Sequence, residues 1–521
     1  MKAEQEIRVL MEMRPALDGF AGIPQETRLL FLALSTLNRV QVEGLLQASL
    51  AFLSTGSGAE PVSEDARIDR VGQVVVSMAD KPSANRWAAM DLFLKRRRIA
   101  FWLALKSVLF PRRVAVRTSW FASRGFESFL WQSLFSKTLL VKDFKQVTQG
   151  VFRVCSIPWN TLQSAGLNVL KWRKRAMYPL IDTTGADVFL AQTPYPGRPT
   201  PGTALVVRYH DAFPLLMPHA FSNMARHRAA HLHALRCNVE SGAYFACVSE
   251  ATRQDLLKVF PDVADRAVTI HNMVSEHYFD EASLPSVVPD IIRVRINTQL
   301  AGASPAFKGL GEQEDFYRQH LLGSAPHSFK YLLMVSTLEP RKNHLCLLAA
   351  WHALRLKNDT QLKLVLVGSA GWGNAAILRE MRPFIDQGSV FVLSGVPAAD
   401  LRALYKHAAA TVCPSLAEGF DFSGVEAMCS GGVVVASDIA VHREVYADAA
   451  LYFDPYSVEG LTARLEELLY GPDANLLQVE LHKHASTVTP CYTMDALLPQ
   501  WAALLDRVTS HQRAATVTQR R

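Results

Sequence analysis

The C-terminal half of the chain alternates short apolar runs with longer amphipathic segments. The apolar runs, which predict strands, lie at 331–335, 362–367, 390–393, 411–414, 433–436 and 450–453. Between several of them, apolar residues recur at helical spacing, which predicts helices at about 343–357, 399–409 and 458–470. Regular alternation of strands and helices is typical of a doubly wound parallel sheet.

The N-terminal half shows the same signal with interruptions. A strand is predicted at 7–11, and a glycine-bearing turn leads into a helix at 27–37. Residues 55–90 are polar and irregular. Four further strands are predicted at 186–191, 203–208, 244–248 and 267–270.

These patterns divide the chain into two α/β domains with a cleft between them. We expect an N-terminal domain over 1–280, with a basic aromatic insertion around 90–150, and a C-terminal domain over 329–490. The Pro-, Ser- and Gly-containing stretch 281–328 is interpreted as a linker. A C-terminal helix and a basic tail are expected over 491–521.

Charge changes the picture in one segment. Residues 91–120 hold eight basic side chains and one acid, so this excess equals the whole formal charge of +7. Aromatic residues are interleaved with the basic ones, which fits a helix lying on an anionic membrane surface. A helix that packs its apolar face on the core and solvates its charges is the competing interpretation. No nucleic-acid-binding module surrounds the cluster, so nucleic acid is not an expected partner.

Composition favours a globular protein of a reducing compartment. The seven cysteines are scattered and form no C-x-x-C pair, which argues against a disulfide framework and a zinc site. The N-terminus lacks the pattern of a signal peptide, and no apolar run is long enough to span a bilayer. We therefore expect a cytoplasmic protein whose membrane contact, if present, is peripheral at the inner face.

The stretch 414–432 carries the main candidate chemistry. It follows a predicted strand, places Glu418 and Glu426 eight positions apart, and then continues as a helix closed by two glycines. In a parallel sheet, ligands bind where strands end and helices begin, because free amides point there. Glu426 also fits a capping box with Ser423, whereas Glu418 has no such local role.

A cationic counterpart follows the first strand of the same domain. Arg341 and Lys342 stand just before a helix, where they are suited to hold a diphosphate. The glycine-containing loop 368–374 forms no complete P-loop, which argues against an ATPase. Carboxylates opposite a cationic pair suit a ligand with hydroxyls and phosphates, such as a nucleotide sugar. In the N-terminal domain, His210 follows a predicted strand, and Gly22 fits either a ligand loop or a tight turn.

These motifs together resemble glycosyltransferase family 4, in its mannosyltransferase-like branch. Glu418 and Glu426 reproduce the E-x7-E signature of retaining glycosyltransferases, and Glu339-Pro-Arg-Lys-Asn343 looks like the second landmark of that family. The similarity covers about 183–275 and 330–470 well, 7–35 loosely, and the basic segment not at all. It continues through weaker landmarks at His210-Asp211, Val248-Ser249, Arg253, Asn272, 436–444 and 449–455.

The resemblance implies a GT-B fold, in which two Rossmann-like doubly wound domains face each other across a cleft, with acceptor bound by the first domain and donor by the second. Carried over by position, Arg341 and Lys342 would neutralise the leaving diphosphate, with no obligatory metal. Glu418 would hold sugar hydroxyls and Glu426 the ribose. The remaining implied donor contacts, with His210 near the anomeric carbon, are Gly419, Phe420, Asp421, Val396 and Gly22.

The chain departs from the family pattern at two positions. The usual Glu-Gly-Phe-Gly-Leu-Pro loop reads Glu418-Gly-Phe-Asp-Phe-Ser423 here, which places an extra carboxylate and a larger ring at the sugar site. Ser336 stands where many members carry an arginine, so the phosphate clamp depends more on Arg341 and Lys342.

The resemblance implies a retaining, metal-independent hexosyltransferase without a cofactor. It would transfer a hexosyl group, mannosyl in our interpretation, from a GDP- or UDP-linked sugar to a cell-surface polysaccharide or a lipid-linked glycan precursor. Two alternatives stay open: a catalytically silent GT-B scaffold subunit, and a retaining transferase similar to sucrose or glycogen synthase.

Overall fold

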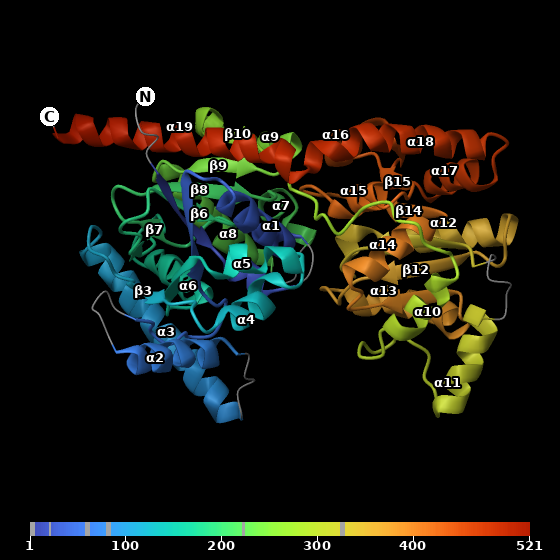
Figure 1. Ribbon diagram of the computed structural model, residues 1–521, viewed down its shortest axis with the longest axis horizontal. Helices are drawn as coiled ribbons and strands as arrows, with labels where there is room; N and C mark the ends of the chain where they lie inside the picture. The colour runs from blue at the N-terminus through green and yellow to red at the C-terminus, as the bar shows by residue number, and fades with distance from the viewer. Residues whose placement is uncertain are drawn as a thin grey trace. The chain divides into compact units, whose positions relative to one another are not determined.

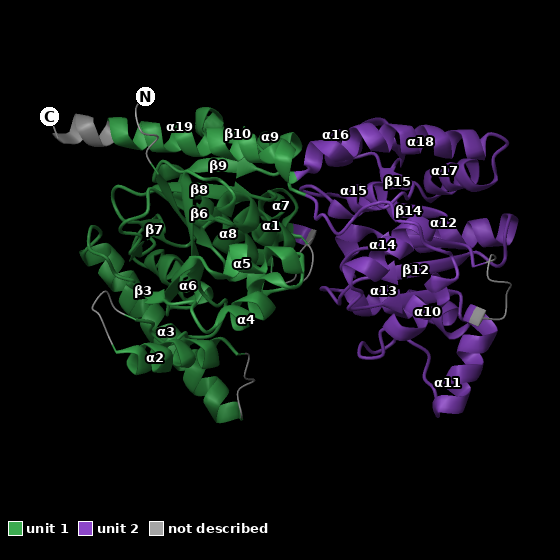
Figure 2. Cartoon of the chain, viewed as in Figure 1, with its two compact units in different colours: residues 1–218, 223–273, 494–521 green, residues 219–222, 274–493 purple. Residues whose placement is uncertain are grey.

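The computed structural model describes residues 6–19, 22–57, 63–79, 85–220, 224–322 and 329–520. The chain forms two compact units, coloured separately in Figure 2. Unit 1 comprises residues 1–218, 223–273 and 494–521, and unit 2 comprises residues 219–222 and 274–493.

Unit 1 is built on an eight-stranded sheet with the order β10-β9-β8-β6-β1-β2-β4-β3. Figure 1 shows β10, β9, β8 and β6 in this order. All neighbouring strands are parallel except β3, which runs antiparallel to β4. The strands are β1 (Ile7–Glu12), β2 (Val40–Leu46), β3 (Thr118–Phe121), β4 (Val151–Cys155), β6 (Val188–Ala191), β8 (Ala204–Tyr209), β9 (Tyr244–Cys247) and β10 (Ala267–Thr269), with a separate pair β5 (Leu180–Ile181) and β7 (Arg198–Pro199).

Helices cover both faces of this sheet. One face packs against a core that includes α1 (Ile23–Ser35), α2 (Glu64–Met78), α5 (Phe144–Thr148) and α19 (Met494–Arg520). The other face packs against α3 (Arg86–Leu109), α6 (Trp159–Val169), α8 (Met224–Glu240) and α9 (Glu250–Val259). Short helices α4 (Glu127–Leu130) and α7 (Phe213–Leu216) complete the unit.

Unit 2 has a six-stranded, fully parallel sheet with the order β13-β12-β11-β14-β15-β16. Numbered within the unit, this is the 3-2-1-4-5-6 order of a doubly wound nucleotide-binding fold. The strands are β11 (Tyr331–Val335), β12 (Lys363–Val367), β13 (Val390–Leu393), β14 (Ala410–Cys413), β15 (Val434–Ser437) and β16 (Ala450–Phe453). The helices are α10 (Val287–Arg295), α11 (Leu310–Tyr317), α12 (His344–Lys357), α13 (Asn374–Asp386), α14 (Ala398–His407), α15 (Phe422–Cys429), α16 (Ala440–Tyr446), α17 (Val458–Tyr470) and α18 (Ala474–Val488).

Three segments differ from the sequence-based expectations. The stretch 55–90 is not irregular throughout, since α2 lies within it and buries Val71 and Val74. The stretch 281–328 was expected as a linker, but its described residues 281–322 belong to unit 2: α10 buries Ile292, and the amide of Asn297 donates to the carbonyl of Val392 at 2.8 Å. The C-terminal helix begins at Met494, continues to Arg520 and belongs to unit 1.

The basic helix α3 packs through small residues and exposes large ones. Ala100, Leu103, Ala104 and Ser107 are buried, and the helix contacts α6. Its largest exposed apolar side chains are Trp87, Met90, Phe93, Leu94, Phe101, Trp102 and Leu109. Neither sequence interpretation describes this arrangement fully, because the helix is anchored to the core and still presents aromatic residues to solvent. Within the part of the chain that is described, no helix is both long enough and apolar enough to cross a bilayer.

Candidate active site

The strand order of unit 2 brings the two candidate loops together. The order reverses between β11 and β14, which are paired neighbours, and ligands of such sheets bind at the carboxyl ends of strands at this switch point. The loop after β11 carries Arg341 and Lys342, and the loop after β14 carries Glu418. The proximity of these loops therefore follows from the topology.

A left-handed asparagine fixes the cationic loop. The residues Pro340–Lys342 form a single 3-10 turn, which ends at Asn343 with φ 63°. The Asn343 side-chain amide donates to the carbonyl of Pro414 at 3.1 Å and to the carbonyl of Pro455 at 2.8 Å. Asparagine tolerates this backbone conformation better than most residues. It therefore locks the loop after β11 to the loop after β14.

Glu418 is held between the two cations. Its carboxylate lies 3.0 Å from Arg341 Nη1 and 2.5 Å from Lys342 Nζ. Arg341 also contacts Glu339 at 2.8 Å. Burial by itself would raise the pKa of Glu418, but the charges of Arg341 and Lys342 outweigh it and lower that pKa. Glu418 is thus an anion near neutral pH, suited to accept hydrogen bonds and unsuited to donate a proton.

Asp421 caps the next helix instead of presenting its carboxylate to solvent. It has φ 65°, in the left-handed region where glycine is preferred, and it is the N-cap of α15. Its carboxylate accepts from the Ser423 amide at 3.2 Å and lies 3.2 Å from His442 Nε2. Burial would raise the pKa of Asp421, yet the His442 and Ser423 hydrogen bonds and the charge of Lys342 lower it below its usual range. The family glycine is therefore replaced here by a residue that keeps its backbone geometry.

This cap excludes the capping box considered for Glu426. Helix α15 begins at Phe422, so Ser423 lies inside the helix and is not its N-cap. Glu426 is buried, and its carboxylate accepts a hydrogen bond from the Tyr405 hydroxyl at 3.1 Å. Glu426 therefore has no capping role that would compete with a role in ligand binding.

The remaining predicted donor contacts of unit 2 lie on both sides of these groups. Gly419 and Phe420 continue the loop after Glu418, and Phe420 is buried against Phe422 and Tyr492, with ring centroids 5.2 and 5.3 Å apart. Val396 follows β13, the edge strand of the sheet, and is half-buried.

In unit 1, His210 directly follows strand β8, and Gly22 stands in the turn before helix α1. His210 follows β8, and burial together with the charge of Arg208 lowers its pKa to about 3, so the imidazole is neutral. Gly22 is the N-cap of α1 with φ 73°, and a side chain added there would meet no atom within 4 Å. Its positive φ favours glycine, and the open space around it permits close approach by a ligand.

A buried ion pair in unit 1, not foreseen from the sequence, supports the strand that carries His210. Arg208 and Glu26 are 2.8 Å apart, and both side chains have 0% exposure. Arg208 also donates to the carbonyls of Ile270 and His271 and to the side chain of Asn272. Burial raises the pKa of Glu26 to about 7, with the charge of Arg208 acting in the opposite direction. Helix α1 and the ends of β8 and β10 are thus joined by one guanidinium.

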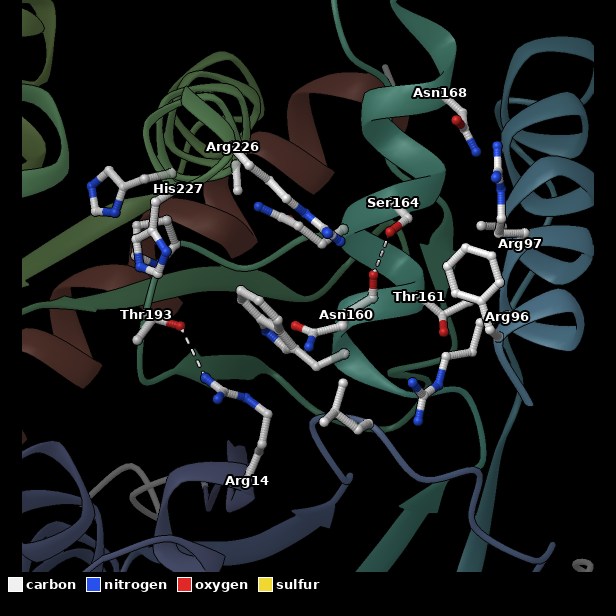
Figure 3. A pocket seen from close by; sticks show the side chains of 18 residues that line it. Arg14, Arg96, Arg97, Asn160, Thr161, Ser164, Asn168, Thr193, Arg226 and His227 are labelled. Atoms are coloured by element: carbon white, nitrogen blue, oxygen red, sulfur yellow. Dashed lines mark hydrogen bonds between the residues drawn. The ribbon is translucent and has the colours of Figure 1, made fainter. Parts of the chain in front are cut away.

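A cavity of about 860 Å³ lies within unit 1 (Figure 3). It is formed by α3, α6, α8 and the loop after β6. Its basic lining residues include Arg14, Arg96, Arg97 and Arg226. Only the basic cluster on α3 is apparent in the sequence, because Arg14 and Arg226 are far from it along the chain.

The fold and the switch-point site define a class of protein. The sucrose-phosphate synthase of Thermosynechococcus elongatus aligns with 97% of this chain and 100% of its own, at TM-score 0.55 and 12% identity. The HepE protein of Anabaena, in complex with UDP and glucose, aligns with 96% and 100%, at TM-score 0.52 and 14% identity. The chain therefore has the GT-B fold, as the sequence predicted.

Sequence comparison gives a family match for part of the chain. Residues 323–485 match the family model described as glycosyl transferases group 1. O-antigen chain mannosyltransferase B of Escherichia coli is 28% identical over 265 residues, which are 51% of this chain and 61% of that protein. O-antigen chain mannosyltransferase RfbU of Salmonella typhimurium is 38% identical over 85 residues, 16% of this chain and 24% of that protein. The similarity to group 1 glycosyl transferases thus lies in unit 2, and the matches span less than two thirds of these relatives.

Proposed function

We propose that the protein is a retaining hexosyltransferase that transfers a mannosyl group from a nucleotide sugar to a cell-surface polysaccharide or its lipid-linked precursor. The observation that carries this proposal is the contact of Arg341 and Lys342 with Glu418 at the switch point of unit 2. The mannosyl donor is supported by the relatives, two of which are O-antigen chain mannosyltransferases.

The chemistry follows from where charge develops. When the bond between the sugar C1 and the diphosphate oxygen breaks, negative charge accumulates on the diphosphate. Arg341 and Lys342 would stabilise it, as a metal does in other transferases, so no metal is needed for that step. The acceptor oxygen bonds to C1 on the same face and loses its proton to the departing phosphate, which retains the anomeric configuration.

The two signature glutamates are not the acid and nucleophile of a glycosidase. Glu418 is ionised between two cations, so it has no proton to give, and Glu426 is bonded to Tyr405. We assign Glu418 to the sugar hydroxyls and Glu426 to the ribose. The amides of Gly419, Phe420 and Asp421 would contact the donor, Val396 the base and Gly22 the donor phosphates. His210, kept neutral by burial, would accept or donate one hydrogen bond near C1.

A catalytically silent scaffold is the second candidate, but no observation favours it, because both cations and both glutamates are in place. The likeness to sucrose-phosphate synthase, at 12% identity, concerns the fold alone. We therefore keep hexosyl transfer as the proposed activity.

A thermal-shift screen of nucleotide sugars tests the donor site. GDP-mannose at about 100 times its dissociation constant should stabilise the protein by about 2.7 kcal/mol, because only the folded state binds it. GDP, UDP-glucose and ATP are the comparison ligands. The proposed function fails if none of the nucleotide sugars raises the melting temperature.

The exposed side of α3 supports a second part of the proposal, that the protein works peripherally at the cytoplasmic face of a membrane. Trp87 and Trp102 are 82% and 53% exposed. Lys95, Arg97 and Arg98 are exposed on the same helix. Exposed aromatics among cations complement an anionic bilayer surface.

Sedimentation with anionic vesicles checks this part. Changing Trp87 and Trp102 together to Ser should lower the vesicle partition coefficient at least about tenfold. The reason is that two indole rings that enter the bilayer surface contribute at least about 1.5 kcal/mol of transfer free energy. Tyr456→Ser is the matched control, since Tyr456 is a 79% exposed aromatic residue of unit 2. If the unmodified protein, the double tryptophan variant and Tyr456→Ser sediment equally, α3 does not bind the membrane.

A further inference from the structure

The cavity of unit 1 is built by elements that the family landmarks do not include. Its walls are α3, α6 and α8, and its volume is about 860 Å³ (Figure 3). The proposed donor site uses none of its residues. It is therefore a separate feature that needs its own explanation.

Unpaired arginines dominate its charge. Arg96, Arg97 and Arg226 line the cavity, and among the described residues none of them has an ion-pair partner. Arg14 is the exception, with Glu12 at 2.7 Å. None of the described lining residues is acidic. Like charges gathered in one cavity repel one another, and a bound anion offsets this electrostatic repulsion.

The orientation of these side chains fits the same purpose. Arg96 and Arg226 extend into the cavity from α3 and α8 (Figure 3). The Nε atom of Arg96 is buried without a hydrogen-bond partner in the described structure, and burial lowers the pKa of Arg96. A guanidinium offers parallel N–H groups that match the oxygens of a phosphate.

Two uncharged polar groups add an independent observation. Thr161 and Gln163 of α6 line the cavity and are 2% and 6% exposed. Thr161 Oγ1 and Gln163 Oε1 are buried, and neither has a partner within the described part of the chain. Buried polar atoms are normally hydrogen-bonded, so these two indicate that the cavity receives a polar ligand.

Part of the remaining lining is apolar and lies beside further polar residues such as Asn160 and Thr193. Trp159, Phe93 and Leu50 line the cavity, and the guanidinium of Arg14 stacks on Trp159 at 4.6 Å. Aromatic faces bind acyl chains and the apolar faces of sugars, and a bare inorganic ion would leave them uncovered. The lining therefore suits a ligand that carries a phosphate next to a carbon-rich part.

We propose that this cavity binds the phosphate or diphosphate ester of the acceptor substrate, with the phosphate held by Arg96, Arg97 and Arg226 and the carbon-rich part against Trp159 and Phe93. The identification of the ligand as acceptor rests on the proposed function, whereas phosphate-ester binding itself does not. Two sources share this chemistry, a polyprenyl diphosphate carrier and a soluble sugar phosphate. Phe93 lies on the same helix as the exposed Trp87, so a carrier in the bilayer is the source that also fits the surface of α3.

Isothermal titration calorimetry with farnesyl diphosphate and with mannose 6-phosphate tests the site in the full chain. The protein should bind at least one of the two esters. The double variant Arg96→Gln, Arg226→Gln should lose at least about tenfold in affinity, because two charge-assisted contacts are removed. Arg98→Gln is the matched control, since Arg98 is an exposed arginine of α3 that does not line the cavity.

The outcomes separate the possibilities. Tighter binding of farnesyl diphosphate identifies a lipid carrier, and tighter binding of mannose 6-phosphate identifies a sugar phosphate; either result, if it depends on Arg96 and Arg226, supports the site. Absence of binding by the folded protein overturns it. So does an equal loss in Arg98→Gln, because the effect would then be general electrostatic attraction. Unchanged melting temperatures of the variants show that folding is intact.

The same proteins distinguish this inference from the proposed function. Stabilisation by GDP-mannose is measured on the double variant, which leaves unit 2 unaltered. In the unmodified protein, donor binding without ester binding overturns the cavity and keeps glycosyl transfer, whereas in the double variant donor binding with weakened ester binding is the expected result. Ester binding without stabilisation by any nucleotide sugar supports the cavity as a phosphate-ester site and overturns the proposed glycosyl transfer.

Discussion

Replacing Lys342 by Ala is expected to lower the rate of glycosyl transfer by at least about 100-fold, on the scale of one electrostatic contact made in the transition state. The Lys342 ammonium is the cation closest to Glu418, at 2.5 Å, and it stands in the loop that the topology places at the switch point. The change leaves Arg341 to hold Glu418, so the loop keeps one of its two ionic contacts. The loss should therefore appear in turnover rather than in folding.

Steady-state transfer from GDP-mannose to a glycan acceptor measures this effect. Lys357→Ala is the matched control, because Lys357 is an exposed lysine of unit 2 that pairs with Glu466 at 2.7 Å. The transfer rate of Glu418→Ala should be lowered by a similar factor for a different reason. This change removes the proposed acceptor of the sugar hydroxyls, while both cations remain. Turnover within twofold of the wild type in Lys342→Ala would take this residue out of the catalytic site.

Replacing Glu26 by Ala is expected to destabilise unit 1 by about 3–5 kcal/mol, the range for breaking a buried ion pair from one side. The variant leaves the Arg208 guanidinium buried with 0% side-chain exposure and without its carboxylate. An arginine does not escape this cost by losing its proton, whereas a buried glutamate does. For this reason the glutamate is the more informative partner to remove.

Hydrogen exchange of the β8 and β10 amides under increasing urea reports the stability of unit 1 separately from that of unit 2. Glu240→Ala serves as the control, because Glu240 forms an exposed pair with Arg175 at 2.9 Å, and exposed pairs contribute little. If β8 and β10 exchange at the wild-type midpoint in Glu26→Ala, the network around Arg208 is not what holds these strands together.

The sequence predicted the strands that are continuous apolar runs and missed β2 and β4, which share a charge pair. β11 and β14 read as uninterrupted apolar runs, and both were found. β2 contains Glu43, which makes the segment look half-polar, but in the fold this carboxylate is buried and lies 2.6 Å from Arg153 of β4. The sequence does not show that the charge of one strand is neutralised by a charge on its neighbour, because it does not show which strands pair.

The same distinction applies to the candidate sites. The contact between Lys342 and Glu418 was predictable, because the two residues follow strands of one parallel sheet. These strands, β11 and β14, are neighbours, so the loops after them lie side by side. The side-chain direction of Asp421 was not, since it depends on His442, which arrives from another helix. The cavity of unit 1 was missed for a related reason: its arginines come from the turn after β1, from α3 and from α8, and only the fold brings them together.

The C-terminal helix α19 has a consequence for synthesis on the ribosome. It supplies Leu497, Trp501, Leu505 and Val508 to the core of unit 1, although the last strand of that sheet ends at Thr269. More than two hundred residues of unit 2 are translated in between. Unit 2 can acquire its complete sheet while the nascent unit 1 still displays an uncovered apolar face, which chaperones must protect until α19 emerges.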